Sequence, residues 1–163
     1  MSTLFEAAVG QYLVRLLFLL AALPVHAGAF QLFGDRPDLE FPEELQWLNV
    51  KHPLTPDDLK GKVVILDFWT YGCINCLHVA EELRRLEDKY GNQLAVIGIH
   101  APKFDNEKNL EALRNIVVRL DRRHPIANDP DWRLFEHLRV RAWPTLVVDH
   151  RENHVLQMAL GHA

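Results

Sequence analysis

The sequence predicts an α/β fold, a sandwich in which helices flank a central mixed sheet. Two patterns carry this prediction. Short apolar runs rich in Val, Ile and Leu alternate with longer segments of helical periodicity, and the last two runs, 145–149 and 155–160, flank a short turn. The chain has 163 residues, of which 48% are hydrophobic and 25% charged, an ordinary balance for one globular domain with its own core.

The centre of the predicted sheet is a buried strand at 63–68, followed by a turn and a long helix that Gly91 ends. The apolar residues of this helix recur at helical spacing, at Leu77, Ala80, Leu83, Leu86 and Tyr90. A second buried strand follows at 94–99. This strand-helix-strand order predicts two parallel strands joined by a right-handed crossover.

Local signals predict the remaining elements. Thr55 and Pro56 begin a single helical turn that Gly61 ends. The other elements are a helix through 110–120 opened by Asp105 or Asn106, a short edge strand at 125–128, a helix after Asp129, and an antiparallel hairpin of 145–149 and 155–160. Segment 31–52 shows no sustained hydrophobic periodicity, and we expect its aromatic side chains to pack on the core.

The chain is predicted to have three parts. Residues 1–27 form a signal peptide or an N-terminal helix, residues 28–60 an N-terminal extension, and residues 61–163 the folded domain. The formal net charge is −4 and the isoelectric point is near 6.1. Since this balance provides no basic patch, nucleic acid is not expected as a partner.

The apolar run after Arg15 decides the expected location. It is about ten residues long, the length of the apolar region of a signal peptide and short for a membrane span. Val25-His26-Ala27 then offers small residues for cleavage after Ala27. The sequence therefore favours an exported or periplasmic protein, with residues 13–25 as a candidate membrane tether, and leaves a cytoplasmic location open.

Cys73 and Cys76 are the two cysteines of the chain, and their C-x-x-C spacing at the start of a predicted helix indicates redox chemistry. Residues i and i+3 share one face of a helix, so the pair can close a disulfide. Unpaired N–H groups and the helix dipole favour a thiolate at Cys73, which we expect to attack, while Cys76 lies one turn further in and resolves. No cofactor beyond this disulfide is expected.

Two other roles are open to the cysteines. They could be inert structural thiols, or they could bind a metal ion together with His78. A metal site is disfavoured because there is no second cysteine pair and His78 faces another side of the helix. Covalent haem attachment is excluded, since Leu77 rather than histidine follows Cys76. We assign no role to His100, His124 or His137.

Asp67 is the third candidate catalytic residue. It is the one carboxylate on an otherwise apolar predicted strand, and burying a carboxylate is costly unless it is used. We expect desolvation to raise the pKa of Asp67, so that this carboxyl exchanges a proton with Cys76. The alternative is a carboxylate satisfied by backbone groups or water.

Taken together, these motifs resemble the thioredoxin superfamily. Asp67-Phe68-Trp69, three further residues and then Cys-x-x-Cys form its pattern, and Trp143-Pro144-Thr145 resembles its cis-proline loop. Gly61-Lys62-Val63-Val64, the stretch from Trp69 to Cys76, and Ala142-Trp143-Pro144-Thr145 most resemble the thioredoxin-like domain of NHL-repeat proteins. Exported, membrane-tethered thiol-disulfide oxidoreductases come next. The resemblance covers roughly residues 45 to 161.

The resemblance implies a thioredoxin-like sandwich that exchanges disulfides with protein substrates and with a redox partner. It further implies that Trp69, Trp143, Pro144 and Thr145 bind the substrate and that the Trp143–Pro144 bond is cis and lies against the cysteines. The two tryptophans could instead serve core packing alone. A different class of function also stays open, a non-catalytic interaction module or a redox sensor within a larger protein.

Two features depart from the superfamily pattern. The dipeptide between the cysteines is Ile74-Asn75 where thioredoxin has Gly-Pro, and this dipeptide helps to set the reduction potential, so the direction of electron flow stays open. The chain also reaches Ala163 where a C-terminal helix would begin. We therefore expect a sandwich without that helix, either as a fragment of a longer protein or with the N-terminal helix covering the exposed face.

Overall fold

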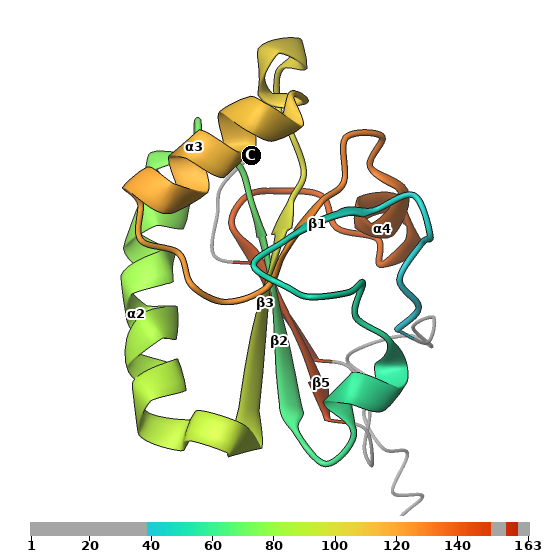
Figure 1. Cartoon of the computed structure of the whole chain (residues 1–163), viewed down its shortest axis with the longest axis vertical. Helices are drawn as coiled ribbons and strands as arrows, with labels where there is room; N and C mark the ends of the chain where they lie inside the picture. The colour runs from blue at the N-terminus through green and yellow to red at the C-terminus, as the bar shows by residue number, and fades with distance from the viewer. Residues whose placement is uncertain (1–38, 151–155, 160–163) are drawn as a thin grey trace, which may run out of the picture. The chain divides into compact units, whose positions relative to one another are not determined.

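The computed structural model describes residues 39–150 and 156–159, and these form a mixed sheet flanked by helices (Figure 1). The strands are β1 (Gln46–Leu48), β2 (Val63–Trp69), β3 (Leu94–His100), β4 (Ile126–Asn128), β5 (Thr145–His150) and β6 (Leu156–Ala159). The helices are α2 (Ile74–Tyr90), α3 (Leu110–Arg119) and α4 (Arg133–His137), with short 3-10 turns η1 (Pro56–Leu59), η2 (Gly91–Gln93) and η3 (Asp105–Glu107). The predicted α/β sandwich is confirmed.

The sheet has the strand order β1-β4-β3-β2-β5-β6 within the described residues. The pairs β2–β3 and β3–β4 are parallel, as the predicted crossover requires, and β5 pairs antiparallel with both β2 and β6. β1 pairs antiparallel with β4, so the prediction of an edge strand at 125–128 is wrong. β1 itself, in the segment without a period, has only three residues, too few for an alternating pattern to show.

The side chains of β2 alternate between two cores. Val64, Leu66 and Phe68 pack on the face that α4 covers, in the cluster that includes Leu134 and Phe135. The other face is covered by α2 and α3 (Figure 1). Ile65 and Trp69 pack on that face, so Asp67 between them points to it as well. The strand is buried on both faces, which explains its nearly continuous apolar sequence.

The start of α3 differs from its prediction. Asp105 lies in the separate turn η3, and α3 begins at Leu110, where the side chain of Asn109 accepts a hydrogen bond of 2.9 Å from the Ala112 N–H. Asp105 and Asn109 are both good helix-capping types, and local sequence alone does not distinguish them. α2 ends as predicted, with Gly91 at its C-cap in a positive-φ conformation.

Several sequence predictions fall outside the described residues. These are the signal peptide or helix at 1–27, the tether at 13–25, most of the turn after β5, and the expectation that a C-terminal helix is lacking. Among the helices that the structure describes, none combines the length and the apolar character needed to cross a membrane.

Candidate active site

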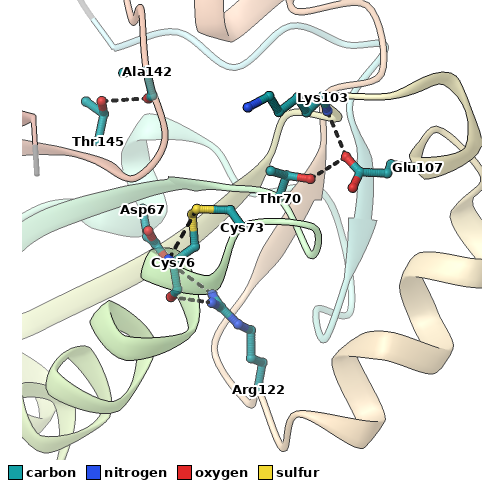
Figure 2. Close-up of a disulfide and its surroundings, with 9 residues drawn as sticks. All are labelled: Asp67, Thr70, Cys73, Cys76, Lys103, Glu107, Arg122, Ala142 and Thr145. Carbon is teal, nitrogen blue, oxygen red and sulfur yellow. Dashed lines mark hydrogen bonds and ion pairs between the residues drawn. A yellow bond between two sulfur atoms is a disulfide. The ribbon is translucent and has the colours of Figure 1, made fainter. Parts of the chain in front are cut away.

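The two cysteines form a disulfide at the N-terminus of α2, where β2 leads directly into the helix (Figure 2). Their Cα atoms are 5.3 Å apart. Cys73 is the N-cap residue, and its Sγ accepts a hydrogen bond of 3.3 Å from the Cys76 N–H. Cys73 is partly exposed, whereas Cys76 is 0% exposed. A partner thiol can therefore reach Cys73 but not Cys76.

Asp67 lies beneath the disulfide and is completely buried (Figure 2). Its Oδ2 accepts a hydrogen bond of 3.0 Å from Nη1 of Arg122, and its Oδ1 has no hydrogen-bond partner among the described residues. Burial raises the pKa of the Asp67 carboxyl above its ordinary value, and the Arg122 guanidinium opposes this rise. A carboxyl with a raised pKa is suited to take up and return a proton near neutral pH.

Arg122 is a site residue that the sequence analysis missed. Its side chain is 2% exposed, and besides the ion pair with Asp67 it donates from Nη2 to the carbonyl oxygen of Cys76 at 3.3 Å. Its guanidinium also lies 3.8 Å from the centre of the Trp69 ring. The sequence does indicate that a buried aspartate needs a positively charged partner. However, no feature of the sequence near Arg122 distinguishes it from the other lysines and arginines, 18 in all.

The two tryptophans predicted for substrate binding lie in different surroundings. Trp69 is completely buried, contacts Arg122 and meets the His100 ring in a T-shaped arrangement. Trp143 is partly buried and stacks on Phe135, with ring centres 4.9 Å apart. Trp69 belongs to the apolar cluster that contains Cys76, and Trp143 packs against that cluster.

The loop before β5 lies at the same end of the sheet as the cysteines. Thr145 is in register with Phe68, near the end of β2, and the Trp143–Pro144 peptide bond is cis. The Thr145 hydroxyl donates a hydrogen bond of 2.8 Å to the carbonyl of Ala142, which closes the turn (Figure 2). Pro144 and Thr145 are both buried.

Glu107 is a second buried carboxylate near the cysteines that sequence reasoning did not find. It accepts hydrogen bonds from the Thr70 hydroxyl and from the Lys103 N–H at 2.7 Å (Figure 2). It also accepts one from the Phe104 N–H at 3.4 Å. A Cβ on Gly72 would lie 2.5 Å from its Oε1, so only glycine fits here without movement of the Glu107 side chain. Glu107 thus ties the loop around η3 to the turn that carries Cys73.

We predict that Glu107→Gln lowers the free energy of unfolding by roughly 1.5 to 3 kcal/mol, because a charged acceptor of three hydrogen bonds becomes a neutral amide. Urea unfolding with the disulfide intact measures the change. Glu111→Gln, at an exposed position of α3, is the matched control and should leave stability nearly unchanged. Equal stabilities of the two variants would contradict the structural role of Glu107.

His100 is buried beside this turn but is held in its neutral form. Its Nδ1 lies 2.9 Å from Oδ1 of Asn128, and its ring stacks on Tyr71. Desolvation lowers the pKa of His100 to about 4, so the imidazole carries no charge at neutral pH. His100 therefore adds no positive charge at the cysteines.

Comparison with known proteins adds three findings on ancestry. The family model described as thioredoxin-like matches residues 61–155. The chain is 49% identical over 123 residues to the chloroplastic protein SUPPRESSOR OF QUENCHING 1 of Arabidopsis thaliana, and 44% identical over 125 residues to NHL repeat-containing protein 2 of Homo sapiens. Each match covers 75% of this chain but only 12% and 17% of those relatives, respectively.

A solved structure shows the same fold. The thiol-disulfide isomerase of Corynebacterium glutamicum superposes with a TM-score of 0.65 at 25% identity, over 80% of this chain and 90% of that protein. The similarity supports a thioredoxin-like fold for this chain. With a matching family model over more than half of its length, this chain belongs to the thioredoxin-like family.

Proposed function

We propose that this chain is a thiol-disulfide oxidoreductase, which uses Cys73 and Cys76 to reduce, oxidise or exchange disulfides in protein substrates. The observation that carries the proposal is the asymmetry of the pair: Cys73 is partly exposed at a helix N-terminus, while Cys76 is buried above the Asp67 carboxyl. Such an arrangement separates an attacking thiol from a resolving thiol.

The proposed reaction transfers two electrons through a mixed disulfide. In the reducing direction the Cys73 thiolate attacks one sulfur of the substrate disulfide, and the other sulfur leaves as a thiolate. Cys76 then gives its proton to Asp67 and attacks Sγ of Cys73, which releases the second substrate sulfur. The Cys73–Cys76 disulfide forms, the substrate disulfide is reduced, and every step runs backwards when the chain acts as an oxidant.

Trp69, Trp143, Pro144 and Thr145 are proposed to form the substrate site. The register of Thr145 with Phe68 supports this for the loop before β5, since it brings the loop to the end of the sheet where Cys73 lies. The backbone of Trp143 would pair with an extended substrate segment next to Cys73. The buried Trp69 would contribute by supporting the site from below.

The domain organisation and the location are also proposals. We propose residues 1–27 as a signal peptide or helix that directs export, residues 28–60 as an extension that supplies β1, and residues 61–163 as the remaining domain. An exported reductant would need an electron source across the membrane, and an exported oxidant a reoxidising partner. The matched part spans less than a fifth of the plant and human relatives, so the activities of those whole proteins are not transferred.

Reduction of insulin by dithiothreitol tests the proposed function. The wild-type protein should accelerate precipitation of the insulin chains, because Cys73 relays electrons from dithiothreitol to the insulin disulfides. Protein whose two thiols were alkylated after reduction is the control. Equal rates for wild-type and alkylated protein would favour the interaction module instead.

A further inference from the structure

Arg122 connects three parts of the site through one side chain. Nη1 donates to Oδ2 of Asp67 at 3.0 Å, and Nη2 donates to the carbonyl of Cys76 at 3.3 Å. Cζ of the guanidinium lies over the Trp69 ring, 3.8 Å from its centre. The planar fork of arginine suits this double donation, and arginine keeps its charge when buried. The side chain therefore places a permanent positive charge in contact with both Asp67 and Cys76 (Figure 2).

Arg122 also fixes which oxygen of Asp67 is available. Oδ2 is held by the guanidinium, whereas Oδ1 has no hydrogen-bond partner among the described residues. Because Nη2 of the same guanidinium holds the Cys76 backbone, the distance between the carboxyl and Cys76 is constrained from both ends. Oδ1 is thus the oxygen free to exchange a proton with Cys76.

Few other charged groups face Asp67. β5 contributes the apolar Leu146 at the register position of Asp67. His124, which precedes β4, is close enough to affect the carboxyl, and its Nδ1 contacts Glu87 of α2 at 3.2 Å. Arg122 lies close enough to His100 of β3 to contribute to the lowered pKa of that imidazole. Of these groups, only Arg122 touches both Asp67 and Cys76 in the described structure.

We propose that Arg122 is a positioning residue that holds Asp67 at Cys76 and keeps its carboxylate ready to accept the Cys76 proton at neutral pH. This inference rests on the proposed function. In the resolving step the proton moves from Sγ of Cys76 to Oδ1 of Asp67, the bond between Cys76 and Cys73 forms, and the substrate sulfur leaves as a thiolate. Arg122 neither gains nor loses a proton, so its contribution is electrostatic and geometric.

The test measures the resolving step with a small disulfide. The reduced protein is mixed with oxidised glutathione, and closure of the Cys73–Cys76 disulfide is followed across pH by acid quench and alkylation. Arg122→Met should slow closure roughly tenfold at neutral pH and move the pH profile to higher pH, because the lost positive charge leaves Asp67 protonated over a wider range. Arg122→Lys keeps the charge without the fork and should lie between Arg122→Met and wild type.

Arg123→Met is the matched control, since the neighbouring arginine is exposed and pairs with Asp121 at the surface. Its profile should coincide with that of the wild type. In an Asp67→Asn background, Arg122→Met should cause no further shift of the profile. If Arg122→Met does not fold, the lysine variant and the double variant Asp67→Asn/Arg122→Met provide the same comparison.

Two results would overturn the proposal. The first is a pH profile of disulfide closure in the folded Arg122 variants that matches that of the wild type. The second is a shift of this profile by Arg122→Met that is equally large in the wild-type and the Asp67→Asn backgrounds. Because glutathione replaces the protein substrate, the profile is measurable even where insulin is not reduced. A failed insulin assay therefore counts against the proposed function, while the profile alone decides the role of Arg122.

Discussion

Replacing Cys73 with serine should abolish disulfide exchange, with a loss of at least about 10³-fold, because the variant lacks the accessible nucleophile. Cys76→Ser should be equally inactive in turnover, yet its Cys73 should still attack the substrate disulfide. Cys73 lies at the helix end and is partly exposed, so its first reaction does not need Cys76. Without the resolving thiol, the mixed disulfide with the substrate persists.

The measurement is trapping of mixed disulfides, followed on non-reducing gels and by mass spectrometry. Cys76→Ser should accumulate adducts through Cys73, and the double variant Cys73→Ser/Cys76→Ser, the control, should form none. Adducts through Cys76 in the Cys73→Ser protein would reverse the assignment. That result would also require Cys76, completely buried in this structure, to become accessible.

The fold was predictable wherever a local pattern extends over a whole element. β2 and α2 have long apolar patterns with a clear stop at Gly91, and both lie where the sequence places them. β1 escaped prediction because its three residues become a strand only through pairing with β4, about 80 positions away in the chain. That pairing also moves β4 from the edge of the sheet into its interior.

The same distinction applies to the site: residues close together in the sequence were predictable, and residues that meet only through the fold were not. Cys73, Cys76 and Asp67 stand within ten positions of one another, so a strand-turn-helix prediction brings them together. Arg122 meets Asp67 across 55 positions and Glu107 meets Thr70 across 37. Neither has a motif of its own, because an arginine or glutamate in a surface-like stretch shows its burial only after the chain has folded.

Asp67→Asn should slow the resolving step roughly 10²-fold at neutral pH, the usual range for loss of a positioned acid or base. The fold should persist, because asparagine has nearly the same shape and its amide oxygen can still accept from Arg122. Stability should rise on the order of 1 kcal/mol at neutral pH, since activity and stability often oppose each other at functional charges. Closure of the disulfide and urea unfolding measure the two effects.

The stability that Asp67→Asn gains over the wild type should increase with pH. Burial raises the pKa of Asp67 in the folded state above its value in the unfolded state, which is about 4. The contribution of the Asp67 carboxyl to stability is therefore fully present below the unfolded-state pKa and is lost as pH rises through the folded-state pKa. Asparagine does not titrate. The lead of Asp67→Asn over wild type should therefore be near zero in acid and grow as the pH rises, whereas Asp57→Asn, at an exposed carboxylate, should show no such growth.

A lead that shrinks or reverses with rising pH would contradict this account. It would mean that pairing with Arg122 outweighs burial and lowers the pKa of Asp67, so that the carboxylate is the more stable form in the folded protein. A permanently ionised Asp67 could not retain the proton of Cys76 through the resolving step. Because the stability curve requires neither a substrate nor a redox partner, it tests the proton-acceptor role of Asp67 independently of turnover.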